Sequence, residues 1–369
     1  MIAACLHLEA KTACLLILLK DLGAKVTAAG SNPLSTQDDI CAALVENGVS
    51  VFSRHGMTTE EYFVNVRSAL SVKPNIIVDD GADLVATVHS EMRDLLPGIR
   101  GGSEETTSGV KRLKSMANGG VLAFPMISVN DAHSKYLFDN RYGTGQSVMD
   151  GILRTTNMLV AGKNVVIAGY GWCGRGVAMR ASAMGARVIV TEIDPHRAFE
   201  ALMDGYEVAS MDDAASRGDI FLTLTGNTRV IRREHFGKMK DGVLLGNAGH
   251  FDVEICKPDL LDLASSVEES RPGVETYTLK DGRRIHLLGE GRLVNLACAD
   301  GHPIEIMDLS FALQLESAVF LAKNSLKPGL YDVPGAIDRA VMEAKLASLH
   351  IRLDRMTPEQ EEYMKSWVE

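Results

Sequence analysis

Short apolar runs alternate along the chain with longer stretches in which apolar positions recur every three to four residues. The short runs have the length of strands, and the longer stretches have the spacing of amphipathic helices. Strands that alternate with helices predict βαβ units around a parallel sheet. In the first part of the chain the pattern predicts strands at residues 2–6, 25–28, 49–52, 75–78, 121–124 and 127–129.

A second alternating series predicts strands at residues 163–168, 187–191, 219–223 and 242–245, and helices follow at 308–323 and 336–349. Near the end, Thr357 and Pro358 are suited to the N-cap and first position of a helix. We therefore predict an α/β protein with two doubly wound, Rossmann-like parallel-sheet domains, a hinge near Asp150 and a C-terminal helical tail. The predicted divisions are residues 1–149, 150–308, 309–345 (helices that return to the first domain) and 346–369.

A glycine-rich turn follows the predicted strand at 163–168. Gly169, Gly171 and Gly174 open a predicted helix, and the strand at 187–191 comes next. In this setting the three glycines permit a tight turn, the approach of a pyrophosphate and close helix–strand packing. Glu192 ends the second strand, and a carboxylate there accepts hydrogen bonds from the ribose hydroxyls of adenosine but repels a 2′-phosphate. The pattern predicts an NAD site rather than an NADP site.

Composition narrows the class of protein. Apolar residues make up 46% of the chain and charged residues 23%, which is typical of a globular protein, and the net charge of −10 disfavours binding to nucleic acid. The six cysteines form no CxxC pair, which indicates a reducing compartment, and no His/Cys spacing matches a structural zinc site, so we expect no metal. Residues 13–19 are apolar but too short to cross a membrane, and Glu9 precedes them instead of a basic segment. We expect a buried helix there, no membrane association and a cytoplasmic protein.

Polar clusters stand where strands are expected to end. They are Asp79-Asp80, the polar loop predicted at residues 103–109, Asn130-Asp131, the pair Lys135 and Asp139, His250 and His302. Carboxylates at the carboxyl ends of parallel strands lie where ligands bind in α/β sheets. Taken singly, each has a structural explanation as well: an Asp after a strand often caps a helix, and Lys135 with Asp139 would also suit a surface ion pair.

Together and in this order, the clusters resemble the S-adenosylhomocysteine hydrolase family over essentially the whole chain. The matching segments are residues 32–38, 79–84, 96–100, 103–109, 138–143, 188–195, 249–255, 290–295 and 301–303. The resemblance implies a first domain that binds substrate and a second that binds NAD. It also implies reversible hydrolysis of S-adenosyl-L-homocysteine to L-homocysteine and adenosine, by transient oxidation at C3′, elimination of the thiol, addition of water and re-reduction, with NAD tightly bound.

The resemblance also implies roles for individual residues. Lys135 and Asp139 are expected to handle the 3′-hydroxyl proton, Asp80 to stand near C4′, Glu105 to hold ribose hydroxyls, and His7 and His250 to carry protons to the leaving sulfur and from water. The substrate site is expected to include His302, Glu9, Lys11, Thr12, Asp80, Glu105, Lys135 and Asp139. The NAD site is expected to include Thr106, Thr107, Ser108, Asn140, Gly169, Gly171, Gly174, Glu192, Asn227, Ala248, Gly249, His250, Asn295 and His302.

The sequence departs from the family pattern at Lys11. Well-known members carry a Glu there that reads the adenine amino group, and a lysine cannot accept a hydrogen bond. This resembles a subgroup of thermophiles and methanogens, some of which prefer S-inosyl-L-homocysteine, so that substrate stays open as the alternative. Relatives also have a helical segment before the first strand, and many have a final Lys and Tyr that reach the neighbouring subunit's cofactor; neither matches here. A homotetramer is expected from the resemblance. Two rivals are an ordinary NAD-dependent 2-hydroxyacid dehydrogenase and a non-catalytic NAD-binding regulator.

Overall fold

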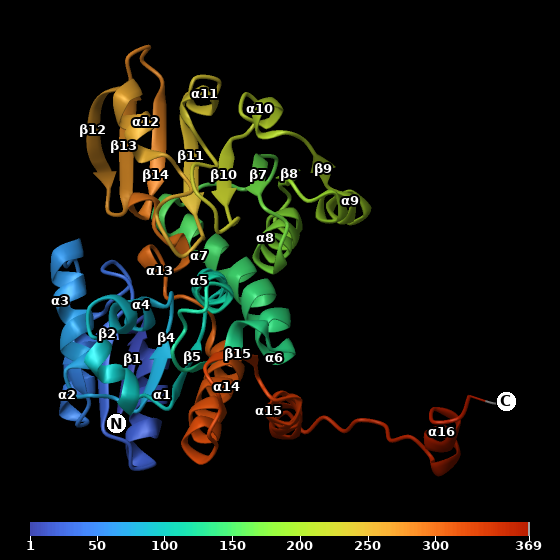
Figure 1. Ribbon diagram of the computed structural model, residues 1–369. Helices are drawn as coiled ribbons and strands as arrows, with labels where there is room; N and C mark the ends of the chain where they lie inside the picture. Colours follow the sequence, from blue (N-terminus) through green and yellow to red (C-terminus); the bar gives the residue numbers. More distant parts are fainter. Residues whose placement is uncertain (368–369) are drawn as a thin grey trace.

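A parallel sheet forms the centre of the first of two lobes in the computed structural model, which describes residues 1–367 (Figure 1). Within these residues its strands lie in the order β15–β6–β5–β4–β1–β2–β3, and every neighbouring pair is parallel. Their bounds are β1 Ile2–Leu6, β2 Val26–Gly30, β3 Ser50–Phe52, β4 Ile76–Asp79, β5 Gly101–Glu104, β6 Pro125–Ser128 and β15 Gly329–Asp332.

Helices cover both faces of this sheet, as the apolar periodicity requires. One face packs against α1 (Ala10–Asp21), α2 (Asp38–Glu46), α14 (Ile304–Lys323) and α15 (Gly335–Ser348). The other face packs against α3 (Thr59–Leu70), α4 (Asp83–Ser90) and α5 (Thr107–Asn118). The late helix α14 and the strand β15 therefore belong to the first lobe, although the second lobe interrupts the chain before them.

The second lobe contains a mixed sheet in the order β12–β13–β14–β11–β10–β7–β8–β9. The strands from β14 to β9 are parallel, whereas β12, β13 and β14 pair antiparallel. Their bounds are β7 Asn164–Ala168, β8 Arg187–Thr191, β9 Glu207–Val208, β10 Ile220–Thr223, β11 Val243–Asn247, β12 Ala264–Arg271, β13 Val274–Leu279 and β14 Arg284–Leu288. The fold is α/β with two Rossmann-like sheets, as the sequence predicts.

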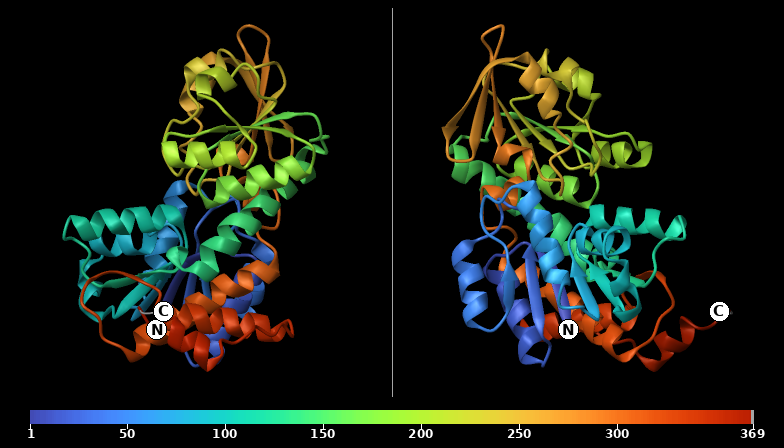
Figure 2. Two further views of the ribbon diagram at one scale, coloured as in Figure 1. Left: turned by 90° about the vertical axis from the view of Figure 1, so that its right-hand side faces the viewer. Right: turned by 60° about the vertical axis from the view of Figure 1, so that its left-hand side comes forward.

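Helices also cover both faces of the second sheet. One face packs against α7 (Thr144–Thr156), α8 (Trp172–Ala183) and α9 (Pro195–Met203), and the other against α10 (Met211–Ala214), α11 (Arg233–Phe236) and α12 (Lys257–Leu263). Asp150, the predicted hinge, lies inside the continuous helix α7. The short α13 (Val294–Ala297) packs on α7 at the junction of the lobes, which both views of Figure 2 separate clearly. The predicted domain boundaries stay a prediction.

Two predictions in the first lobe are wrong. Residues 121–124 are not a strand, because the backbone N–H of Ala123 donates to His89 Nε2 at 3.0 Å instead of a neighbouring strand. Residues 103–109 are not one polar loop, because Ser103 and Glu104 belong to β5 and α5 begins at Thr107. A Cβ on Gly102 would lie 2.8 Å from the Ile77 carbonyl oxygen, so small residues let β5 pack closely between its neighbours.

The end of the chain extends away from the first lobe (Figure 1). Its helix α16 (Pro358–Tyr363) begins at the predicted position, with Thr357 as N-cap in a capping box. The predicted tail 346–369 includes residues 368 and 369, which lie outside the described part of the chain. Among residues 1–367, no helix has the length and apolar character needed to span a bilayer.

Candidate active site

A cavity lies at the carboxyl end of the first sheet, where the second lobe faces it. His7, Asp80 and Glu105 each come directly after a strand, namely β1, β4 and β5. Because these strands are parallel neighbours, their carboxyl ends bring the three side chains to one edge of the sheet. The second lobe contributes His250, which follows β11, and His302 stands ahead of α14.

A buried lysine forms the centre of the cavity wall. Lys135 ends the short helix α6 (His133–Lys135), and Asp139 lies in the π-helical segment Tyr136–Gly143 that continues from it. The Lys135 Nζ donates to Asp139 Oδ1 at 2.9 Å and to Asn140 Oδ1 at 2.7 Å, and it lies 3.6 Å from Glu105 Oε1. The side chains of Lys135, Asp139 and Glu105 are 6%, 5% and 9% exposed, so this is no surface ion pair.

Charge within this cluster keeps the lysine protonated and the aspartate ionised. Burial alone would lower the pKa of Lys135, but the carboxylates of Asp139 and Glu105 outweigh it and hold that pKa above its ordinary value. Burial alone would raise the pKa of Asp139, but Lys135 and His302 outweigh it and hold that pKa below its ordinary value. For Glu105 burial prevails and raises the pKa to about 7.

The helix α14 supports the carboxylates from behind. Ser310 Oγ donates to Asp139 Oδ2 at 2.7 Å, and Gln314 Nε2 donates to Glu105 Oε2 at 2.5 Å. Ser103 Oγ in turn donates to Gln314 Oε1 at 2.6 Å. Among residues 1–367, the buried Glu105 Oε1 has no hydrogen-bond partner, although Lys135 Nζ lies 3.6 Å away, so this oxygen of a cavity-lining residue can still accept a hydrogen bond.

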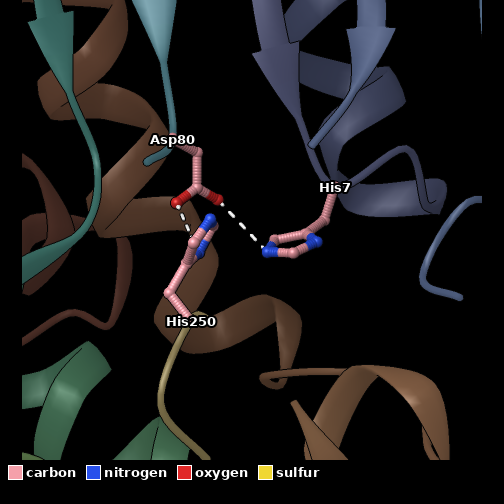
Figure 3. Close-up of side chains that lie close together, drawn as sticks. All are labelled: His7, Asp80 and His250. Atoms are coloured by element: carbon pink, nitrogen blue, oxygen red, sulfur yellow. Dashed lines mark ion pairs between the residues drawn. The ribbon is translucent and has the colours of Figure 1, made fainter. Parts of the chain in front are cut away.

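Opposite the lysine, Asp80 stands between two imidazoles, and Figure 3 shows each of its carboxylate oxygens directed at one ring. His7 Nε2 lies 3.3 Å from Asp80 Oδ2, and His250 Nδ1 lies 3.6 Å from Asp80 Oδ1. Burial lowers the pKa of His7 to about 4, against the opposite effect of Asp80. His7 is therefore neutral at neutral pH, with a ring nitrogen able to take up a proton.

At the end of the cavity beside α1, Glu9 caps the helix, and its carboxylate accepts from the backbone N–H groups of Lys11 and Thr12. The Lys11 Nζ lies 2.6 Å from Glu9 Oε2 and donates to the Asp300 carbonyl oxygen at 2.8 Å. Lys11 thus joins α1 to the loop that carries His302. This end of the cavity presents both an ammonium and a carboxylate.

An elongated cleft of about 1320 Å³ adjoins the cavity and runs along the glycine-rich turn of the second lobe. A Cβ on Gly174 would lie 1.9 Å from the Gly169 carbonyl oxygen, so α8 approaches this turn as closely as only glycine allows. Glu192 accepts backbone N–H groups from Tyr170 at 2.7 Å and from Ile193 at 2.7 Å, which orients its carboxylate at the edge of the cleft. The cleft has the architecture of a dinucleotide site.

Comparison with known proteins decides the family. A model described as "S-adenosyl-L-homocysteine hydrolase" matches residues 1–97, and one described as "S-adenosyl-L-homocysteine hydrolase, NAD binding domain" matches residues 140–301. The chain belongs to the S-adenosyl-L-homocysteine hydrolase family. An adenosylhomocysteinase of Thermococcus kodakarensis is 60% identical over 99% of this chain and 87% of its own, and an S-inosyl-L-homocysteine hydrolase of Methanopyrus kandleri is 58% identical over the same shares.

Among solved structures, the A chain of dipicolinate synthase from Bacillus subtilis superimposes with a TM-score of 0.51 at 12% identity, over 88% of this chain and 98% of that one. At this identity the likeness concerns the fold alone. It agrees with the two Rossmann-like sheets of this S-adenosyl-L-homocysteine hydrolase family member and adds nothing about its chemistry.

The NAD-binding domain of this hydrolase-family enzyme has residues that fit the cofactor. The turn at Gly169 and Gly171 leaves the backbone open to a pyrophosphate at the start of α8, and Glu192 supplies a carboxylate for ribose hydroxyls. Deeper in the site, among the described residues, the buried Asn295 Oδ1 has no hydrogen-bond partner. An unpaired acceptor at this depth is what a bound ligand would satisfy.

The structure gathers the residues that the sequence singles out for the hydrolase site. The cavity is lined by His7, Glu9, Lys11, Thr12, Asp80, Glu105, Thr106, Thr107, Lys135, Asp139, Asn140, Ala248, His250, Asn295 and His302. The cleft is lined by Thr106, Thr107, Ser108, Asn140, Gly169, Gly171, Glu192, Asn227, Ala248, Gly249 and His250. Gly174 lines neither and lies behind Gly169. Asn295 and His302 line the cavity and not the cleft, and the roles of all these residues stay predictions.

Sequence reasoning missed three supporting residues of this hydrolase site. Ser310 and Gln314 hold Asp139 and Glu105, and Ser35 Oγ lies 2.6 Å from His7 Nδ1. The signal on α14 is visible in retrospect, because polar residues at positions 310, 314 and 317 share one face of an otherwise apolar helix. Nothing in the sequence near Ser35 points to His7.

Proposed function

We propose that this enzyme catalyses the reversible hydrolysis of S-adenosyl-L-homocysteine to L-homocysteine and adenosine. One observation carries the proposal: a buried lysine with two carboxylates shares a cavity with an Asp80 that is flanked by two histidines, and this cavity adjoins the dinucleotide cleft. The names of the relatives support the same reaction. A plain dehydrogenase needs a base beside the cofactor, whereas this cavity holds two separate proton-carrying groups.

The lysine side of the cavity is suited to the ribose. When bound, NAD supplies a hydride acceptor for the 3′ carbon and returns the hydride later. Lys135 Nζ donates a hydrogen bond of 2.9 Å to Asp139 Oδ1, and we assign to this pair the proton of the 3′-hydroxyl. A positive charge bound nearby would lower the pKa of Lys135 and so favour loss of its proton. Glu105 Oε1, the unpaired acceptor, receives a ribose hydroxyl.

The histidine side is suited to the carbon–sulfur bond. A 3′-ketone acidifies the proton on C4′, and we place the Asp80 carboxylate beside that carbon. His7 and His250, on either side of Asp80, then deliver a proton to the departing homocysteine sulfur and take one from the attacking water. Because burial lowers its pKa to about 4, the His7 ring is neutral at neutral pH and keeps one ring nitrogen without a hydrogen.

S-inosyl-L-homocysteine is the second candidate substrate, and Lys11 favours it. An ammonium has donors only, so Lys11 can donate to the O6 of hypoxanthine but cannot accept from the amino group of adenine. The neighbouring Glu9 carboxylate is the acceptor that would serve adenine. Relatives of both names lie within a few per cent of one another in identity.

Release of a free thiol, followed with a thiol reagent alongside the absorbance of NADH, tests the proposal. We expect thiol from S-adenosyl-L-homocysteine with no net NADH, whereas a 2-hydroxyacid dehydrogenase accumulates NADH and a regulator does neither. Parallel assays with S-inosyl-L-homocysteine identify the base. Lys11→Gln is expected to lower kcat/KM for the inosyl substrate by roughly 10-fold relative to the adenosyl one, because a neutral amide donor replaces the charged donor to O6. Lys20→Gln, on the same helix with an exposed ion pair to Asp21, is the control.

We also propose that the enzyme is a cytoplasmic homo-oligomer, a tetramer by family resemblance, with a small-molecule substrate and no nucleic-acid partner. The net charge of −10 supports the last point. The exposed apolar side chains of the extended tail, among them Ile351, Leu353 and Trp367, support assembly with further copies. Sedimentation velocity of the full chain, compared with a chain that ends at residue 348, tests the assembly.

A further inference from the structure

Three side chains with unshared electron pairs converge on one point of the cavity. His7, Asp80 and His250 place one nitrogen or oxygen each within 4.8 Å of one another (Figure 3). His7 and Asp80 come from the first lobe and His250 from the second, so the group spans the junction. The side chains are 13%, 8% and 5% exposed, which keeps bulk water from screening them.

Hydrogen bonding around His7 determines which of its nitrogens carries the lone pair. Ser35 Oγ donates its hydrogen to the Asn32 carbonyl oxygen at 3.1 Å. Ser35 Oγ also lies 2.6 Å from His7 Nδ1, and when the serine accepts at this contact the hydrogen of the neutral ring is on Nδ1. Nε2 then directs a lone pair at Asp80 Oδ2 across 3.3 Å. In that tautomer, Nε2 and the Asp80 carboxylate both offer electron pairs that a metal cation can accept.

The group matches the ligand set of an open metal site. Two imidazoles and a carboxylate, with a fourth position open to ligand, form a common catalytic-type zinc set, and zinc bonds of about 2.0–2.1 Å place tetrahedral ligands ~3.3–3.4 Å apart. His7 Nε2 lies 3.3 Å from Asp80 Oδ2 and His250 Nδ1 lies 3.6 Å from Asp80 Oδ1, and one ligand atom of each residue lies within 4.8 Å of the other two, so binding of one ion would draw the three ligand atoms together. Ser35 supplies the outer hydrogen bond that orients a ligating histidine.

We propose that His7, Asp80 and His250 bind a divalent transition-metal ion of the Zn²⁺ type, which reversibly blocks the active site. The ion occupies the electron pairs that carry protons in the proposed reaction, and it ties the two lobes together through His250. Binding of the ion stands independently of the proposed function, and only the block rests on it. The site differs from a structural zinc centre, because it offers three protein ligands and leaves a position open to the cavity.

Calorimetric titration of Zn²⁺ into the NAD-loaded, chelator-treated full chain tests the binding, and the visible spectrum of Co²⁺ in its place reports tetrahedral coordination. We expect one ion per chain, displaced by adenosine. Asp80→Asn and His250→Gln should each weaken binding at least 10-fold, and Ser35→Ala about 10-fold through the orientation of His7. Cys14→Ser and His196→Gln, which remove exposed ligands elsewhere, should leave the affinity unchanged.

The results of these titrations distinguish metal binding at this site from its absence and from misfolding of the variants. No binding to the wild-type chain, or unchanged binding in both Asp80→Asn and His250→Gln, overturns the proposal. Full NAD content and an unchanged melting temperature in the variants exclude misfolding as the cause of lost binding. Because the titration needs no turnover, Zn²⁺ binding together with no thiol release from either substrate by the zinc-free enzyme would leave the metal site standing and refute the proposed reaction alone.

Discussion

Replacing Asp139 by Asn removes one charge from the buried cluster while keeping the size of the side chain. Lys135 then keeps Asn140 and the Glu105 carboxylate at 3.6 Å, but loses the carboxylate at 2.9 Å. At 2.9 Å two unit charges attract by roughly 6 kcal/mol at an effective dielectric constant of about 20, and at 3.6 Å by roughly 5 kcal/mol. The remaining pair with Glu105 therefore retains most of the compensation for the buried ammonium.

Measured losses on removing one member of a buried ion pair are about 3–5 kcal/mol. Since Glu105 remains, we expect Asp139→Asn to lower the free energy of unfolding by about 3 kcal/mol. The rate of thiol release should fall by roughly 10²–10⁴-fold, because the proton partner of Lys135 is gone, while NAD stays bound. The matched control is Glu91→Gln, which breaks an exposed ion pair with Arg67 and should cost less than about 1 kcal/mol.

Urea unfolding across a range of pH measures the effect and its sign. The lowered pKa of Asp139 means that its contribution is complete above its ordinary value near 4 and is lost as pH falls through the native pKa. The raised pKa of Lys135 means that its contribution is complete below about 10 and is lost as pH rises through the native pKa. The difference between wild type and variant should therefore be constant only from about pH 8 to 9, and it should change below about pH 7, where Glu105, whose raised pKa depends in part on Asp139, takes up a proton. A loss no larger than that of Glu91→Gln, with wild-type rates, refutes this account.

Three further predictions concern the glycine-rich turn, the choice between NAD and NADP, and the buried carboxyl group of Asp79. Gly174→Ala should weaken NAD binding at least 10-fold and lower the free energy of unfolding by about 1–3 kcal/mol, because the new Cβ would meet the Gly169 carbonyl oxygen at 1.9 Å. Fluorescence titration measures the first effect and urea unfolding the second. Gly335→Ala is the control, because its Cβ would enter open space. Glu192→Gln should lower the affinity for NAD and raise that for NADP in the same titration, and unchanged affinities for both would contradict its role. Burial raises the pKa of Asp79 to about 7, so wild-type stability should fall as pH rises from about 4 to 7, and Asp79→Asn should lack that part of the slope in urea unfolding.

Local patterns predicted much of the fold. The strands predicted at 2–6 and 187–191 coincide with β1 and β8, because short runs of apolar and β-branched residues between turns favour a buried strand by their local sequence. The prediction missed β5, whose sequence Gly-Gly-Ser-Glu has no strand propensity, and the antiparallel strands β12 and β13 at the sheet edge. Their pairing depends on neighbours that no local window contains.

Part of the candidate site also follows from local sequence, and the rest depends on the tertiary fold. The glycine-rich turn is local chemistry, and Gly169, Gly171 and Glu192 line the predicted cleft because strand, turn and helix follow one another directly in the chain. The resemblance supplied Lys135, Asp139 and His250, and the fold gathers them with Asp80 around one cavity. From the local pattern alone, each of these residues could also be explained as a helix cap, a structural histidine or a member of a surface ion pair.

Chain order and short-range periodicity were sufficient for the α/β class, the dinucleotide turn and most strand positions, because these depend on residues within one βαβ unit. Folding was needed for the rest: Ser310 and Gln314 reach Asp139 and Glu105 across separations of 171 and 209 residues. The raised pKa of Lys135 also depends on the tertiary fold, because it results from burial opposed by nearby carboxylates. Burial is a property of the packed lobes rather than of any one segment of the chain.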